Sequence, residues 1–203
     1  MYIIEIENNG LTELLHEMNP QSLRRVSDCE FTDELDSVDS ANITVPLQNP
    51  AYANLHELTT LVRIINTRTK EIEFDGRILQ VSEESMDSNG IITKKVICEG
   101  VLGYLCDSVQ LYHHYEETDV TGFLASLLDT HNYLMSWYSP ERVILLGACT
   151  MHGTDSKTTA QRSTMEEIEE NLISRLGGIL HTRRNENNQI VLDYYREEDF
   201  GQV

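Results

Sequence analysis

Two pairs of alternating apolar segments, each pair joined by a short polar connection, constrain the fold of this chain most strongly. The first pair spans residues 61–65 and 71–75, and the second spans residues 77–83 and 91–98. Alternation of apolar and polar residues is typical of a half-buried β-strand. The second connection contains Asn89-Gly90, which supplies the positive φ angles that a tight reversal requires. Each pair therefore predicts an antiparallel hairpin.

The rest of the first hundred residues has the same character. Further strands are predicted at residues 2–7, 25–34 and 41–45. The last two flank the polar segment 35–39 and predict another hairpin. Pro50 interrupts the pattern within residues 48–52, which we expect to cross an open end of the sheet. These short antiparallel strands predict a β-barrel-like or sandwich-like domain over residues 1–105.

Helical spacing appears only after residue 105. Apolar residues recurring from Val120 to Leu128 predict a helix that ends near Asn132, with Thr118 or Asp119 as its N-cap. A second helix is predicted from the capping box at residues 163–166 to Gly177, and a closing hairpin is predicted at residues 178–183 and 190–195. The fold class is therefore α+β, and residues 106–203 form a small α+β domain with two helices and a C-terminal hairpin.

The charge of the chain excludes two classes of partner. Its 34 acidic and 15 basic side chains give a formal net charge of −19, and residues 1–50 hold 10 acidic residues against 2 basic ones. Such a surface repels phosphate groups, so we expect neither stable nucleic-acid binding nor attachment to an anionic membrane.

The sequence also lacks a recognisable signal peptide or membrane-spanning segment. The N-terminus has neither the basic start nor the long apolar run of a signal peptide, and no stretch has the apolar length of a membrane span. We therefore expect a protein that is made and kept in a cytoplasm. The cysteines, Cys29, Cys98, Cys106 and Cys149, form no CxxC pair, which predicts reduced and mostly buried thiols and leaves a disulfide open.

Two clusters contain residue types that carry chemistry. They are His113-His114 with Glu116-Glu117, and Cys149 with His152. The first lacks the ligand spacing of a metal site, and we interpret it as a solvated loop before a helix. The second lacks further ligands or a third group that would orient a nucleophile pair. The sequence thus predicts no catalytic residue, no metal ligand and no cofactor.

Aromatic residues are another candidate for binding. Tyr133, Trp137 and Tyr138 lie close together in sequence, as do Tyr194 and Tyr195. Such side chains can form a surface on which sugars stack, although packing in a core or an interface is the commoner role.

Three stretches of the chain resemble a family of viral proteins. They are Phe74-Asp75-Gly76-Arg77-Ile78-Leu79, Cys98-Glu99-Gly100-Val101-Leu102-Gly103-Tyr104-Leu105-Cys106-Asp107-Ser108, and Ser163 to Leu180 with its Arg175-Leu176-Gly177-Gly178 turn. The segments Asn49-Pro50-Ala51-Tyr52 and Leu192-Asp193-Tyr194 agree with the same family in order and spacing. The chain resembles the N-terminal hub region of siphophage tail proteins, the prophage tail-endopeptidase or tail-associated lysin family. That family is related in fold to the baseplate hub of contractile-tailed phages. Cys106 and residues 133–159 depart from the family pattern.

The resemblance implies a structural, non-enzymatic role at the virion tail tip, in a protein assembled in the bacterial cytoplasm. Members form homotrimers whose barrel domains continue the tail tube and attach to the distal tail protein, while other domains cap or plug the tip. A tape-measure protein is a further implied partner. Members also continue past the strand at residues 192–194 into later hub domains and often a peptidase or receptor-binding region. The chain is therefore expected to be a fragment of a longer protein.

In a tail-tip ring the acidic charge would also have a function. An acidic lumen would repel the DNA that slides through it, which predicts that acidic residues of the first domain share one side.

Two other classes of function stay open. One is a metal-dependent hydrolase that uses His113, His114 and Glu116, and the other is a carbohydrate- or receptor-binding module that uses the aromatic residues from Tyr133 to Tyr138.

Overall fold

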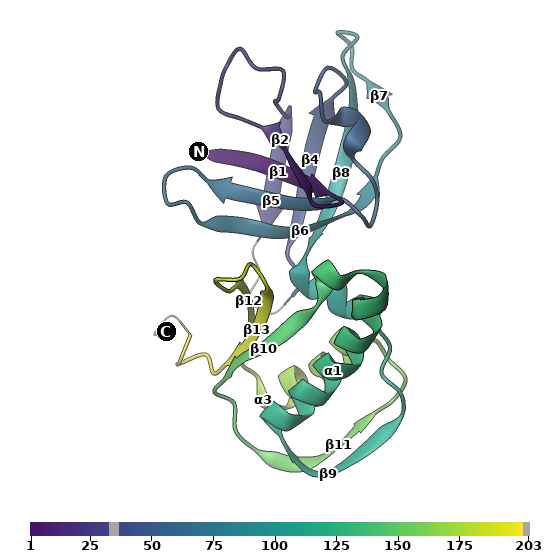
Figure 1. Cartoon of the computed structure of the whole chain (residues 1–203), viewed down its shortest axis with the longest axis vertical. Helices are drawn as coiled ribbons and strands as arrows, with labels where there is room; N and C mark the ends of the chain where they lie inside the picture. The colour runs from purple at the N-terminus through teal and green to yellow at the C-terminus, as the bar shows by residue number, and fades with distance from the viewer. Residues whose placement is uncertain (33–36, 201–203) are drawn as a thin grey trace. The chain divides into compact units, whose positions relative to one another are not determined.

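The computed structural model describes residues 1–32 and 37–200, which form two compact units (Figure 1). Among the described residues, unit 1 comprises residues 1–32 and 38–101, and unit 2 comprises Ser37 and residues 102–200. The sequence placed this change at residue 105, within the 3₁₀ helix η2 (Val101–Asp107) that follows the last strand of unit 1. Residues 33–36 hold part of the hairpin connection predicted around residues 35–39 and lie outside the described residues.

Unit 1 is an antiparallel sheet that curls around its own apolar face as half of a barrel (Figure 1). The strand order is β2-β1-β5-β6-β8-β4-β3, and the short β7 also pairs with β8. The bounds are β1 (Tyr2–Asn8), β2 (Leu11–His16), β3 (Asp28–Thr32), β4 (Ser40–Pro46), β5 (Leu61–Asn66), β6 (Ile72–Val81), β7 (Ser85–Met86) and β8 (Ile92–Gly100).

The inner face of this sheet is the core of unit 1. Alternate residues of each strand point inward, and the largest of them are at most 2% exposed: Ile4, Ile6, Leu15, Ile43, Val45, Val62, Ile64, Phe74, Ile78 and Val96. Burial of one such side chain contributes about 1.5–3 kcal/mol relative to leaving it in water. The alternating pattern in the sequence is the direct cause of this one-sided sheet.

The predicted hairpins of unit 1 are confirmed. β3 pairs with β4, β5 with β6, and β6 with β8, all antiparallel. One detail was wrong, because the predicted strands at residues 71–75 and 77–83 are a single strand, β6, which pairs with β5 along its first part and with β8 along its last. The sequence reading also missed β2, which follows β1 across Asn9-Gly10 with φ angles of 50° and 77°.

Close backbone packing explains the glycines of the two stretches, on β6 and β8, that carry the family resemblance. Gly76 lies opposite Gly100 in the β6–β8 ladder. A Cβ on Gly76 would overlap the Glu99 carbonyl, and a Cβ on Gly100 would lie 2.8 Å from the Asp39 Cβ. Arg77 and Glu99, the next pair along, form an ion pair with Nε to Oε1 at 2.6 Å.

The segment 48–52 is organised by Asn49, whose side chain is 2% exposed. Its Nδ2 donates to the carbonyl oxygens of Leu15 at 2.8 Å and Arg25 at 3.1 Å, and its Oδ1 accepts from the Ala51 N–H at 3.0 Å. These bonds tie the end of β2, the chain before β3 and the turn before the 3₁₀ helix η1 (Tyr52–Asn54) to one amide.

Unit 2 combines a three-stranded sheet, a two-stranded ribbon and two helical segments. In the sheet, β13 (Ile190–Tyr195) lies between β12 (Ile179–Arg184), which is antiparallel to it, and β10 (Ile144–Cys149), which is parallel to it. The ribbon pairs β9 (His113–Asp119) with β11 (Thr154–Thr159). The hairpin predicted at residues 178–183 and 190–195 is therefore confirmed, whereas β10 and β11 were not predicted.

The first helix, α1 (Val120–Tyr138), is longer than predicted. Asp119 is its N-cap and accepts from the Gly122 N–H at 2.6 Å. The predicted end near Asn132 is wrong because His131 and Met135 continue the buried stripe. The Asn132 side chain bonds the backbone of Ile144 in β10 and does not end the helix. The short 3₁₀ helix η3 (Pro140–Arg142) follows.

The second helix begins at the predicted capping box, where Ser163 and Glu166 exchange hydrogen bonds. It runs as α2 (Thr164–Ile168), a π-helical turn η4 (Glu169–Ile173) and α3 (Ser174–Leu176), and Gly177 ends it with φ of 68°. The π turn was not predicted. Within the described residues, no helix combines the length and the apolar character needed to cross a membrane.

Replacement of Asn49 by Ala is expected to destabilise unit 1. The change removes the Asn49 amide from the carbonyl oxygens of Leu15 and Arg25 and from the Ala51 N–H, which should lower the free energy of unfolding by about 2–4 kcal/mol. Urea denaturation measures the loss. Asn187→Ala, at an exposed loop position, is the matched control and should change stability by less than about 0.5 kcal/mol. Equal effects of the two substitutions would contradict the role given to Asn49.

Candidate functional site at the free edge of the curled sheet

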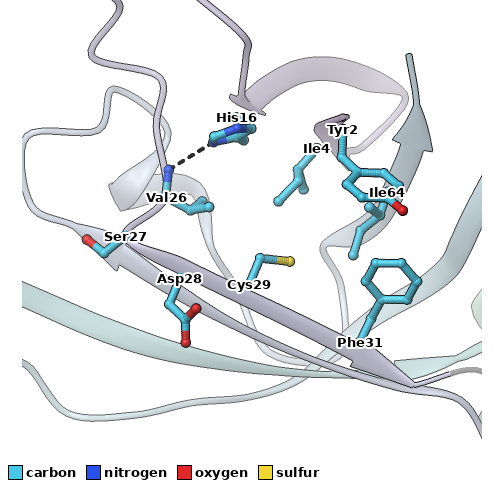
Figure 2. Close-up of a pocket in the computed structure, with 9 residues that line it drawn as sticks. All are labelled: Tyr2, Ile4, His16, Val26, Ser27, Asp28, Cys29, Phe31 and Ile64. Carbon is cyan, nitrogen blue, oxygen red and sulfur yellow. Dashed lines mark hydrogen bonds between the residues drawn. The ribbon is translucent and has the colours of Figure 1, made fainter. Parts of the chain in front are cut away.

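A cavity of about 330 Å³ lies in unit 1 between β3 and the opposite wall of the curled sheet (Figure 2). Its lining is mainly apolar and comes from β1, β3, β5, the end of β2 and the chain before β3: Tyr2, Ile4, His16, Val26, Ser27, Asp28, Cys29, Phe31 and Ile64. Because β2 and β3 are the two ends of the strand order and do not pair with each other, the cavity occupies the place where a full barrel would close.

Two of the contacts across this gap lie beside the cavity. The rings of Tyr2 and Phe31 meet edge to face with centroids 5.7 Å apart. His16 Nδ1 accepts from the Val26 N–H at 3.2 Å. The Cys29 thiol points into the space between these contacts (Figure 2). Side chains therefore join the two ends without a backbone ladder.

The two edges of the sheet differ in how their backbone is covered. Near the end of β2, Arg24 Nη1 donates to the Leu14 carbonyl at 2.7 Å, and Asn49 donates to the Leu15 carbonyl. β3 pairs with β4 on one side, and no other strand among residues 1–32 and 37–200 pairs with it. β3 therefore presents the free edge of the half-barrel.

The outer face of the sheet carries acidic residues on β1 and β3. Ile4 and Ile6 face the core, so Glu5 and Glu7 of β1 lie on the outer face. On β3, Cys29 and Phe31 pack against the core, which places Asp28, Glu30 and Thr32 on the same outer face. Glu7 pairs with Arg63 of β5 at 3.2 Å. Asp28 and Glu30 are exposed.

Two groups that line the cavity, His16 and Cys29, have pKa values shifted toward their neutral forms. Burial lowers the pKa of His16, and Arg25 lowers it further. Burial raises the pKa of Cys29 to about 11, with a smaller contribution from Asp28. The imidazole and the thiol therefore add no charge to a lining that is mainly apolar apart from Ser27 and Asp28, which suits an apolar side chain.

The segment with His113, His114, Glu116 and Glu117 is not the predicted loop. It forms β9, because it pairs with β11 over most of its length. The His113 ring packs edge to face on Tyr115 at 4.5 Å, whereas His114 Nδ1 lies 2.9 Å from Thr158 Oγ1. Consecutive strand residues point to opposite faces, so the two imidazoles do not converge. Across the described part of the chain, no three His, Cys, Asp or Glu residues are grouped so that they could hold a metal ion.

The cysteines are unbridged thiols that differ in exposure. Cys98 is buried, Cys29 and Cys149 are half-buried, and Cys106 is exposed, which departs from the prediction of mostly buried thiols. Cys149 Sγ lies 3.9 Å from the Met151 carbonyl oxygen, and His152 is exposed.

Unit 2 contains a buried serine and histidine pair that the sequence reading missed. Ser108 Oγ lies 2.8 Å from His131 Nδ1 and 2.7 Å from Thr164 Oγ1, and His131 Nε2 lies 3.1 Å from the Arg142 carbonyl oxygen. This arrangement resembles a nucleophile and its base. Ser108 is only 1% exposed and His131 is 0% exposed, so both side chains are closed off from solvent, and their hydrogen bonds connect α1 to Ser108 and to the Arg142 carbonyl.

The two predicted aromatic clusters differ in their exposure to solvent. Tyr194 and Tyr195 on β13 are buried and belong to the core of unit 2. Tyr133, Trp137 and Tyr138 near the end of α1 are 67%, 73% and 80% exposed. Three exposed aromatic side chains at the end of one helix can contact a partner.

Comparisons with known proteins give structural matches only. No family model matches the chain, and no curated protein matches it in sequence. The tail protein from Neisseria meningitidis MC58 matches with a TM-score of 0.54 and 13% identity, over 94% of this chain and 50% of that chain. The 43 kDa tail protein of prophage MuSo2 from Shewanella oneidensis matches with a TM-score of 0.53 and 11% identity, over 94% of this chain and 52% of that chain. The chain shares its fold with these two tail proteins.

The chain spans about half the length of each of the two tail proteins. The lidded PdpA-VgrG complex of Francisella matches with a TM-score of 0.50 and 11% identity, over 99% of this chain and 29% of that chain. Because 94% of the chain is covered in each tail protein match, the shared fold includes elements of both units.

Acid is expected to destabilise unit 2 through His131. Burial is the main cause that lowers the pKa of this histidine from its ordinary value of 6.5. The unfolded chain then binds more protons than the folded chain between the folded-state pKa and 6.5. The contribution to stability is therefore complete above about pH 6.5 and falls as the pH drops from there toward the folded-state pKa.

Urea denaturation between about pH 8 and pH 5 measures this effect. His131→Gln should be less stable than the wild type at high pH by about 1–3 kcal/mol and should lose less stability on acidification. The control His152→Gln, at an exposed position, should keep the wild-type pH profile. An unchanged profile in His131→Gln would contradict the neutral, buried state of His131.

Proposed function

We propose that the protein is a structural component of a phage-type tail, at the tail tip, where it continues the tail tube and caps or plugs its end. The observation that carries the proposal is the match to two phage tail proteins over 94% of the chain, which includes elements of both units. The family resemblance of residues 74–79 and 98–108 supports the hub assignment within the tail.

Several features support a scaffold role without catalysis. Unit 1 is a half-barrel with a free edge, the histidines of β9 point apart, and the Ser108–His131 pair is sealed in the core. On this proposal the working surfaces are strand edges and faces that contact other subunits. The longer protein would be a homotrimer in the virion tail tip, assembled in the bacterial cytoplasm, with the distal tail protein and the tape-measure protein as partners.

The acidic outer face of the sheet suits a channel for DNA. Glu5, Glu7, Asp28 and Glu30 share the face that points away from the core. If this face lines the ring, it repels the phosphate backbone and keeps the DNA from adhering. The proposal therefore assigns the outer face of β1 and β3 to the lumen.

Antibody labelling of tails tests the location. Particles induced from the strain that encodes the chain are labelled with gold-coupled antibody against unit 1 and viewed by negative-stain electron microscopy. Label should gather at the tail end away from the head, while an antibody against the tube protein should decorate the whole shaft. Label along the shaft or at the head, or particles that lack the protein, would contradict the proposal.

The exposed aromatic residues of α1 favour a second candidate, a carbohydrate- or receptor-binding module. Tyr133, Trp137 and Tyr138 offer exposed rings on which a sugar can stack. If so, the protein should bind host surface glycans on an array, and Trp137→Ala should weaken that binding at least about tenfold, since a stacked aromatic is worth about 1.5 kcal/mol. Tyr112→Ala, at a position that is 69% exposed outside α1, is the control. Binding that is equal in both variants would remove this candidate.

A further inference from the structure

The outer edge of β3 and the cavity beside it form one surface, here called the β3 edge. It consists of the backbone of Asp28–Thr32, the inward side chains Cys29 and Phe31, and the outward acids Asp28 and Glu30. We propose that the β3 edge binds a β-strand of a different protein, in which apolar residues alternate with lysine or arginine. This binding depends on unit 1 alone and would hold whether or not the protein belongs to a tail.

The backbone of β3 supplies the first reason. Its pairing with β4 uses one side of the strand, and alternate residues leave N–H and C=O groups on the other side. No strand within residues 1–32 and 37–200 covers that side. An added strand would satisfy these groups through a regular ladder, which is the way that many domains recognise extended peptides.

The cavity supplies the second reason. Side chains of a strand alternate between the two faces of a sheet, so every second side chain of an added strand would lie on the same side as Cys29 and Phe31. That side faces the 330 Å³ cavity, whose wall opposite β3 is formed by Tyr2, Ile4 and Ile64 (Figure 2). The volume is within the range of about 300–1,000 Å³ that is usual for binding pockets. The neutral His16 and Cys29 leave the cavity suited to an apolar side chain.

The charges decide which strand is accepted. The remaining side chains of the added strand would lie beside Asp28 and Glu30 on the outer face. A second copy of β3 would place acids beside acids, and the chain carries a net charge of −19, so self-pairing is disfavoured. Lysine or arginine at those positions would form cross-strand pairs of opposite charge. Edge charges commonly keep identical chains apart, and here they also select a basic partner.

Peptide binding tests the proposal on the full chain. The probe is a fluorescein-labelled peptide of alternating lysine and valine, titrated at physiological salt and followed by fluorescence anisotropy. The reference peptide has the same length and charge but carries proline at its two central valine positions, which blocks the ladder. The alternating peptide should bind at least about tenfold more tightly than the proline peptide, and equal binding would mean general charge attraction only and would overturn the proposal.

Charge reversal provides the matched variants. The double substitution Asp28→Lys and Glu30→Lys should weaken binding of the lysine peptide at least about tenfold and should allow a peptide of alternating glutamate and valine to bind. The control pair Glu186→Lys and Glu197→Lys makes the same change of charge at exposed positions of unit 2 and should leave affinity within about twofold. Equal losses in the two variants would overturn the proposal.

The cysteine in the cavity reports where the peptide sits. Alkylation of Cys29 by N-ethylmaleimide at mildly alkaline pH, located by mass spectrometry, should slow at least about fivefold when the peptide fills the cavity. The exposed Cys106 of unit 2 is the internal control and should react at an unchanged rate. Unchanged alkylation of Cys29 with the peptide bound, or dimerisation of the chain alone in light scattering, would contradict the proposed occupant.

Discussion

The incomplete closure of the sheet in unit 1 is the constraint on which the rest of that unit depends. A sheet with one apolar face must cover that face, and unit 1 does so by curling the sheet onto itself. Strands at the ends of the order then approach each other without pairing, and side-chain contacts join the two ends, among them the Tyr2–Phe31 contact, the His16–Val26 hydrogen bond and the hydrogen bonds of Arg24 and Asn49 to the end of β2. The cavity and the free edge of β3 both follow from this arrangement.

Unit 2 contains polar side chains that are buried and paired with hydrogen-bond partners. Asp193 on the central strand β13 is 0% exposed, accepts from Arg183 Nε at 2.7 Å, and accepts from the Ala148 N–H at 2.6 Å. Gly147 leaves room for it, because a Cβ there would overlap the carboxylate. A partnered carboxylate inside a sheet is costly to disturb, since the loss of either partner leaves a charge uncompensated. A second buried polar group consists of Ser108, His131 of α1 and Thr164 of α2, which are joined by hydrogen bonds.

The sequence predicted the elements that rest on local signals and missed those that rest on distant contacts. The hairpins of unit 1 and the Ser163 capping box follow from alternation, turn residues and cap chemistry, which act within a few residues. β10 was missed because its continuous apolar run has no period, and β9 because its polar side chains hide a strand paired with β11. The cavity could not be predicted, because its lining comes from residues between Tyr2 and Ile64 that only the curl brings together. The Asn-Gly turn at residues 9–10 was a readable signal for β2.

The central claim is that unit 1 is a half-barrel whose free β3 edge is the surface that assembles with other proteins. Hydrogen–deuterium exchange of the Asp28–Thr32 amides, compared between the purified chain and intact tails, tests it most directly. Those amides that face away from β4 should exchange quickly in the purified chain and become protected at least about tenfold in tails, as expected when an open edge gains a strand. The amides of β5, which lies between two strands in both states, should not change. Equal exchange of the β3 amides in both samples would contradict the account.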